Sequence, residues 1–296
     1  MKSGAVAPHP LAFVALLAGA VAIGFAPIFV RLADVSPAAS AFWRVALATP
    51  LLWAWALAAG RSQPVPDAPE ARSGPPGSAL LAGVFFACDL AAWHVAIAWT
   101  SVANATLEAN VAPVFVALGA WLLWQQRPSR LFMAALALTL CGAVLLIGPN
   151  ARIGERAFTG DLLGLLTAVF YAGYMLSLKR AAMQMPTARV MMLSTSMSAA
   201  VLLPWALATS EQFLPAGLQG WAVLAGMALL AQVGGQSLIA FALAHLPAAL
   251  SSTSLILQPV LSMLFAWVLL GEGMVPLQML GAAVVLAGIT LARRTA

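Results

Sequence analysis

Two stretches of this sequence, 112–126 and 258–272, are copies of each other and decide the fold. The first reads Ala-Pro-Val-Phe (112–115) and then Ala-Trp-Leu-Leu-Trp-Gln-Gln (120–126). The second reads Gln-Pro-Val-Leu (258–261) and then Ala-Trp-Val-Leu-Leu-Gly-Glu (266–272). Pro113 and Pro259 are 146 positions apart, and so are Gly142 and Gly288. The chain is therefore expected to consist of two repeats, residues 1–150 and residues 151–296.

The composition places both repeats in a membrane. The chain is 62% hydrophobic and only 8% charged, whereas about a quarter of the residues in a soluble domain are charged. Apolar runs of about 20 residues predict membrane-spanning helices, because lipid offers no partner to the backbone polar groups. The ten predicted spans are 11–33, 38–59, 79–99, 102–124, 131–148, 160–180, 189–209, 218–242, 249–270 and 275–292.

Five spans per repeat is an odd number, so the second repeat enters the membrane in the opposite orientation to the first. We therefore expect an all-α integral membrane protein, with ten transmembrane helices arranged as two inverted five-helix repeats around a central cavity. Such inverted repeats are typical of secondary transporters, which bind substrate near the membrane midplane. Pro113 and Pro259 lie near the middle of corresponding spans, and interrupted helices at such positions point to a transport site. A simple packing kink is the alternative interpretation.

The distribution of Lys and Arg predicts that both termini are cytoplasmic, since cytoplasmic loops of membrane proteins are enriched in these residues. In this orientation ten basic residues are inside: Lys2, Arg61, Arg72, Arg127, Arg130, Lys179, Arg180, Arg189, Arg293 and Arg294. The outer loops carry only Arg31, Arg152 and Arg156. The net charge of +5 is explained by these loops, so membrane lipid is an expected partner and nucleic acid is not.

Four ionisable side chains lie deep inside the predicted spans, away from their ends, where a charge costs several kcal/mol and is expected to face a cavity or a partner. Their depths predict that Arg44, His94 and Glu108 form a layer in the outer half of the membrane. Asp89 is expected nearer the midplane, together with Asn110.

This cluster occurs in only one repeat. The positions that correspond to Asp89, His94, Glu108 and Asn110 are Gly235, Ala240, Ser254 and Ile256. The asymmetry favours a role with the substrate or a coupling ion over a purely architectural one. For Arg44 we favour the structural alternative, an ion pair that holds helices together or takes part in gating. Trp93, beside His94, is deeper than the interfacial tryptophans and is a candidate to stack on an apolar or aromatic ligand.

The second repeat contributes neutral polar side chains. Gln232 and Gln236 lie four residues apart on one face of the eighth span, and Gln258 directly precedes Pro259. Tyr171 lies near the middle of the sixth span. We predict that these residues bind substrate, with hydrogen bonding between helices as the alternative.

The chain resembles the drug/metabolite transporter superfamily, EamA type, in three features. These are the two five-helix halves, Phe42-Trp43-Arg44 in the second span and Gly271-Glu272 at the end of the ninth. The resemblance extends from about residue 11 to residue 294, and Gln125-Gln126 departs from the Gly-Glu that is usual in the first half. Within the superfamily the chain is most similar to the YddG-type exporters of aromatic and other apolar amino acids. The resemblance implies a basket of helices in the bacterial inner membrane, with the fifth and tenth spans outside it.

We therefore expect a secondary transporter that exports amino acids with apolar or aromatic side chains by alternating access. Glu108 or Asp89 would accept the substrate's ammonium group. The candidate partners of its carboxylate are His94, Asn110, Gln258 and the helix ends freed at Pro113 and Pro259. Export of lipophilic cations is the alternative, since buried carboxylates and aromatic rings suit such ligands as well.

The sequence does not predict an enzyme. It contains no HExxH motif, no nucleophile elbow and no P-loop. The two cysteines, Cys88 and Cys141, have no metal-ligand spacing, and we expect neither a cofactor nor a metal site. Protons are a candidate coupling ion because Glu108 and His94 are ionisable, and facilitated diffusion is the alternative. A monomer or a homodimer is expected.

Overall fold

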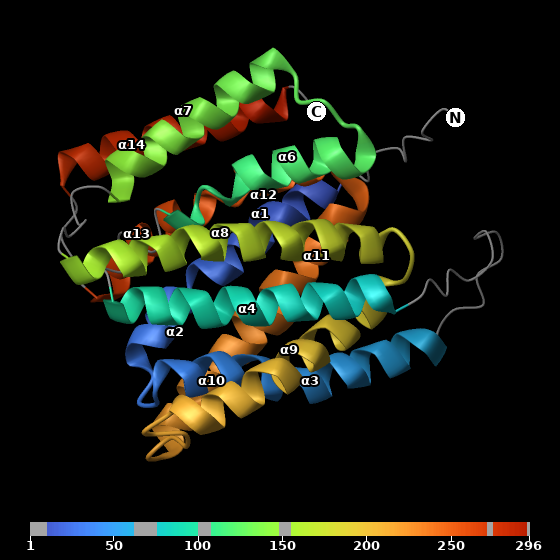
Figure 1. Ribbon diagram of the computed structural model, residues 1–296, viewed down its shortest axis with the longest axis vertical. Helices are drawn as coiled ribbons and strands as arrows, with labels where there is room; N and C mark the ends of the chain where they lie inside the picture. The colour runs from blue at the N-terminus through green and yellow to red at the C-terminus, as the bar shows by residue number, and fades with distance from the viewer. Residues whose placement is uncertain (1–10, 62–75, 100–107, 148–154, 271–274, 295–296) are drawn as a thin grey trace.

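The computed structural model describes residues 11–61, 76–99, 108–147, 155–270 and 275–294, which form helices and their connections (Figure 1). The helices of the first repeat are α1 (Ala12–Gly24), α2 (Ala26–Leu32), α3 (Pro37–Arg61), α4 (Gly77–Trp99), α6 (Ala112–Trp124) and α7 (Arg130–Ile147). Those of the second are α8 (Glu155–Ala182), α9 (Thr187–Thr209), α10 (Leu218–Met227), the π-helix η2 (Ala228–Gln236), α11 (Ser237–His245), α12 (Ala248–Ser254), α13 (Leu257–Leu270) and α14 (Pro276–Arg293).

Eight helical segments are long and apolar enough to cross a membrane. They are Ala12–Leu32, Pro37–Ala59, Gly77–Ala96, Phe158–Ala182, Thr187–Thr209, Leu218–His245, Ala248–Leu269 and Pro276–Arg293. The shorter apolar helices α6 and α7 occupy the places of the predicted fourth and fifth spans. The first part of the fourth span and the Gly271-Glu272 motif lie outside the described residues. Ten complete spans therefore remain a prediction.

Large apolar side chains cover the outside of the bundle. Leu122, Leu207 and Val268 are each more than 60% exposed, at 63%, 61% and 64%. A water-soluble monomer rarely exposes wide apolar patches, whereas lipid solvates such side chains. The exposed apolar surface and the eight long apolar helices together describe a multi-pass membrane protein.

The central helices pair across the two repeats. α4 packs against α8, α1 packs against η2 and α11, and α3 packs against α9. α7 packs mainly against α14, and the two lie together at one edge of the bundle (Figure 1). The interior is thus formed by the other helices, with α7 and α14 outside it.

The contact between α7 and α14 is made by glycines. A methyl group on Gly142 would lie 2.6 Å from the backbone nitrogen of Val285, and one on Gly288 would lie 2.8 Å from that of Thr139. In lipid no hydrophobic effect drives helices together, so their association depends on van der Waals packing. Small residues let membrane helices approach closely and gain this contact. The later part of α7 faces the earlier part of α14 in these contacts, so the two helices run antiparallel.

Three of the predicted spans contain interruptions. The first breaks at Phe25 between α1 and α2, just ahead of Pro27. A turn at 110–111 precedes α6, in which Pro113 occupies the first helical turn. A turn at 255–256 separates α12 from α13, and Pro259 follows it. The two corresponding prolines therefore sit directly after breaks, as expected because proline lacks the N–H that an uninterrupted helix requires there.

Candidate functional site

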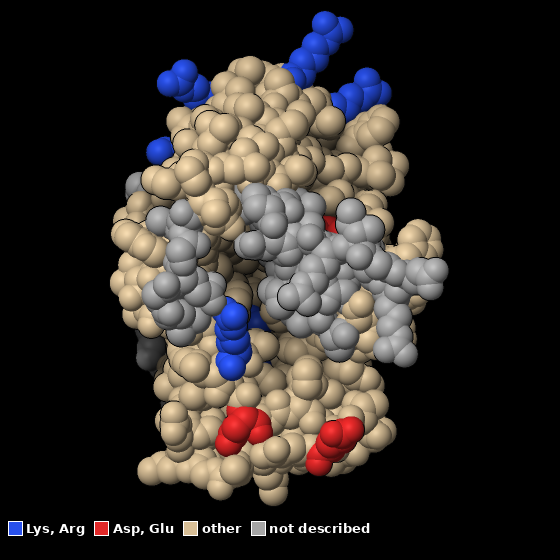
Figure 2. Space-filling view, turned by 90° about the vertical axis from the view of Figure 1, so that its left-hand side faces the viewer, with Lys and Arg blue, Asp and Glu red and all other residues tan. Residues whose placement is uncertain are grey.

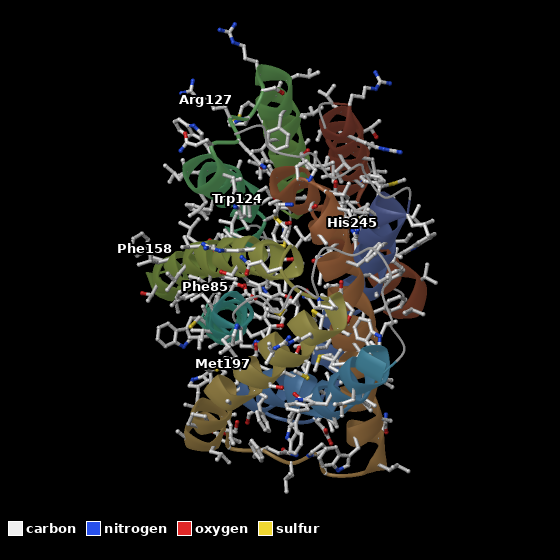
Figure 3. All side chains as sticks on the ribbon, turned by 90° about the vertical axis from the view of Figure 1, so that its right-hand side faces the viewer. Phe85, Trp124, Arg127, Phe158, Met197 and His245 are labelled. Carbon is white, nitrogen blue, oxygen red and sulfur yellow. The ribbon has the colours of Figure 1, made fainter. Side chains whose placement is uncertain are left out.

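Four helices bring polar side chains together in the interior of the bundle. Arg44 comes from α3, Asp89 from α4, Tyr174 from α8, and Gln232 and Gln236 from η2; all five are buried. Their helices are neighbours, since α4 packs on α8 and α3 packs on both α9 and η2. In Figure 3, Phe85 on α4 and Met197 on α9 mark two of these adjoining helices. Residues from both repeats thus form one interior polar cluster.

Arg44 is oriented by a chain of hydrogen bonds. Its Nε donates to Oε1 of Gln232 at 3.2 Å, and Nε2 of Gln232 donates to Oγ1 of Thr195 on α9 at 3.1 Å. The guanidinium carbon lies 5.4 Å from the centre of the Phe86 ring, within range of a cation–π interaction. Gln232 and Phe86 thus hold the guanidinium in place, and Thr195 holds Gln232.

The tyrosines on α8 form the aromatic part of the cluster. The hydroxyl of Tyr174 donates to Oε1 of Gln236 at 2.9 Å, and the Tyr174 ring stacks on Phe86 with centroids 4.6 Å apart. The Tyr171 ring lies 5.9 Å from that of Tyr174, and the Tyr171 hydroxyl is close to the side chain of Gln258. Nε2 of Gln258 is buried and has no hydrogen-bond partner among the described residues. The cluster therefore extends to α13.

Asp89 provides the acidic side chain of the cluster. Its side chain is 7% exposed and interacts electrostatically with Arg44 and with both tyrosines. Within the described residues the carboxylate of Asp89 and the guanidinium of Arg44 form no ion pair at 4 Å or less. An acidic and a basic side chain thus lie in one low-dielectric region without direct contact.

His94 and Trp93 lie further along α4. Nδ1 of His94 is 2.6 Å from the carbonyl oxygen of Leu90, and because a carbonyl can only accept, this nitrogen is the donor. Nε2 of His94 is buried and has no hydrogen-bond partner in the part of the chain that the structure describes. The Trp93 ring meets the imidazole edge-on, with centroids 5.2 Å apart. His94 also interacts electrostatically with Arg44.

Glu108 and Asn110 lie at the break before α6, and both are half-buried. The carboxyl group of Glu108 packs over Gly164 on α8, where any side chain would collide with it. The structure therefore brings two members of the predicted layer, Arg44 and His94, into electrostatic contact. It places the third, Glu108, against α8.

Sequence reasoning missed the π-helix and the role of Lys179. η2 contains Gln232, Gly234 and Gln236, and π-helical segments often mark functional sites. The sequence signal was the Gly234-Gly235 pair beside two glutamines. Lys179, which we had expected in an inner loop, is buried; its Nζ donates to the carbonyl oxygens of Leu243 at 3.0 Å and Leu246 at 2.8 Å. It binds the C-terminal end of α11, and nothing in the sequence indicated this contact.

An interior polar cluster inside a bundle of apolar helices suits a protein that moves polar solutes through the membrane. The described residues contain no group of three metal-ligating side chains. The chain belongs to the EamA-like transporter family, whose pattern matches residues 10–148 and 158–294. The family domain is thus present twice, and the protein is a transporter of the drug/metabolite type rather than an enzyme.

The chain is similar to two named relatives and to one solved structure. The pseudopaline exporter CntI of Pseudomonas aeruginosa strain UCBPP-PA14 is 26% identical over 155 residues, which cover 52% of this chain and 53% of that protein, about half its length. The uncharacterized transporter YwfM of Bacillus subtilis strain 168 is 28% identical over 213 residues, 71% of each chain. One crystal structure covers 95% of this chain and 96% of its own with a TM-score of 0.80 at 18% identity, which shows a shared fold.

Proposed function

We propose that this transporter exports amino acids with apolar or aromatic side chains across the bacterial inner membrane by alternating access. The observation that carries the proposal is the interior cluster in which the basic Arg44 and the acidic Asp89 lie beside the rings of Phe86 and Tyr174. An amino acid zwitterion has two opposite charges and one side chain. Partners for the two charged groups and for the side chain are therefore present in one cluster.

Alternating access requires two halves that can rock against each other, and the contact between α7 and α14 supports two inverted repeats. Gly142 faces Val285 while Thr139 faces Gly288. Each member of one pair lies 146 positions from a member of the other. Equivalent residues therefore exchange places across an antiparallel contact, as a two-fold axis in the membrane plane requires.

The exposed arginines support cytoplasmic termini. Six of them lie at the ends of α6 to α9 and α14 that share one end of the bundle in Figure 1: Arg127, Arg130, Arg180, Arg189, Arg293 and Arg294. Figure 3 looks onto this end, with Arg127 beyond α6. Arg31, in the last turn of α2, lies at the opposite end. The opposite end also bears the exposed carboxylates Asp34 and Glu211. Figure 2 looks onto that opposite face, where acidic side chains lie near the lower edge. The positive-inside rule favours a cytoplasmic location for the arginine-rich end.

The second candidate is export of lipophilic cations, which the carboxylates of Asp89 and Glu108 and the Trp93 ring would favour. The buried guanidinium of Arg44 opposes it, because a fixed positive charge beside Asp89 repels a cation. The relative's name supports export as the direction, and pseudopaline therefore belongs in the panel of test substrates.

The experiment is a counterflow assay with the purified protein in liposomes. Vesicles are preloaded with unlabelled phenylalanine, leucine, pseudopaline or methyl viologen and receive a trace of the same labelled compound outside. Accumulation of label with phenylalanine and leucine is expected. Accumulation with methyl viologen alone would replace the proposal by cation export, and accumulation with pseudopaline alone would replace it by the relative's substrate. Empty liposomes provide the background.

A further inference from the structure

The guanidinium of Arg44 is buried but incompletely bonded. Arginine has five N–H donors, and in the described residues only Nε of Arg44 has an acceptor, Oε1 of Gln232. The side chain is 7% exposed. An arginine that served only to hold α3 to η2 would be expected to satisfy its terminal donors with carbonyl or carboxylate groups, because a buried charge without partners is costly.

The side chain of Asp89 does not bond to the terminal donors of Arg44. Asp89 interacts electrostatically with Arg44, yet no ion pair at 4 Å or less joins them in the described chain. The Asp89 carboxylate also has no hydrogen-bond partner among those residues. One group with free donors and one with free acceptors thus face the same interior region, while Gln232 and Phe86 hold the guanidinium in place.

Arg44 is suited to a planar anion. Its terminal nitrogens present parallel donors that match the two oxygens of a carboxylate, and such bidentate bonds are stronger than neutral ones. The stack of Phe86 on Tyr174, with Tyr171 beside it, offers an apolar surface next to both charges. A ligand that satisfies all three features has a carboxylate, an ammonium group and an apolar side chain.

Resting on the function proposed above, we propose that Arg44 binds the carboxylate of the substrate and Asp89 binds its ammonium group. The substrate class is then α-amino acids in which both groups are free. Arg44 is a specificity-determining residue instead of a structural one, and amides, esters and amines without a carboxylate are poor substrates.

The first test uses the wild-type protein and needs no variant. Counterflow of labelled phenylalanine is challenged with three unlabelled compounds. Phenylalanine has both charged groups, phenylalaninamide has only the ammonium group, and 3-phenylpropionate has only the carboxylate. Loss of one charge-assisted contact corresponds to roughly a tenfold or greater loss of affinity. We expect both analogues to compete at least about tenfold more weakly than phenylalanine. Equal competition by either analogue would overturn the assignment of the group it lacks.

The second test exchanges the residues themselves. Arg44→Gln is expected to abolish the preference for phenylalanine over phenylalaninamide, and Asp89→Asn to abolish the preference over 3-phenylpropionate. Arg127→Gln and Glu211→Gln make the same chemical changes at exposed positions and should keep both preferences. A uniform loss of affinity for all three compounds, with the preferences intact, would show that the charged pair is structural.

The two proposals fail differently. If the wild-type protein gives no counterflow with phenylalanine or leucine, the proposed function is wrong. If it transports phenylalanine but does not discriminate against the analogues, only the assignment of Arg44 and Asp89 is wrong. If a variant does not fold, the competition series on the wild-type protein decides alone.

Discussion

The hydrogen bond from Tyr174 to Gln236 offers a sharp test of how the interior cluster is held together. Tyr174→Phe removes the hydroxyl but keeps the ring that stacks on Phe86 at 4.6 Å. Oε1 of Gln236, which accepts that hydroxyl at 2.9 Å, loses its partner inside the bundle. A buried acceptor left without a partner costs about 1–3 kcal/mol. Each kcal/mol corresponds to a few degrees in the unfolding temperature, so we expect a decrease of roughly 2–10 °C.

The assay is thermal unfolding of the purified protein in detergent, with a double variant as the decisive comparison. Replacing both partners by apolar side chains of similar shape is often nearly neutral, so Tyr174→Phe combined with Gln236→Leu should recover most of the lost stability. If the single variant unfolds at the wild-type temperature, or if the double variant is less stable than the single one, the reasoning is refuted.

Two further predictions concern the packing around the cluster. Lys179→Met leaves two backbone carbonyls at the C-terminal end of α11 without their ammonium partner, and we expect about 1–3 kcal/mol of destabilisation, measured as a lower unfolding temperature. Lys179→Arg should retain most of the stability. If the Lys179→Met variant is as stable as the wild-type protein, the contact between Lys179 and α11 does not stabilise the fold. Gly83→Ala puts a methyl group against the backbone carbonyl of Ser194, so overpacking of α4 on α9 should cost about 1–3 kcal/mol. Gly77→Ala, at a position with open space around it, is the control, and equal unfolding temperatures of the two variants would show that the helices simply move apart.

The spans were accessible to prediction because lipid imposes a local rule. A helix that crosses the hydrocarbon must be apolar along its length, so composition alone marks its place. The segments Thr187–Thr209 and Pro276–Arg293 agree with the predicted spans to within a few residues. The breaks before Pro113 and Pro259 were equally local, since proline lacks the backbone donor that a helix interior requires.

The internal arrangement was not accessible in the same way. Depth along each span can be counted from the sequence, and this count gave the predicted layer of Arg44, His94 and Glu108. The rotation of each helix about its own axis depends on how its neighbours pack, and this rotation turned Glu108 towards Gly164. The π-helix η2 and the burial of Lys179 likewise depend on contacts between residues far apart in the chain.

The sequence by itself determined that this protein is a membrane-embedded helical transporter built from two copies of one unit, because hydrophobic length and internal repetition are properties of the chain alone. Only the tertiary structure decided which polar side chains meet. The bond from Arg44 to Gln232 joins residues 188 positions apart. Such a pairing depends on the rotation and crossing of several helices at once, and no pattern along the chain encodes it.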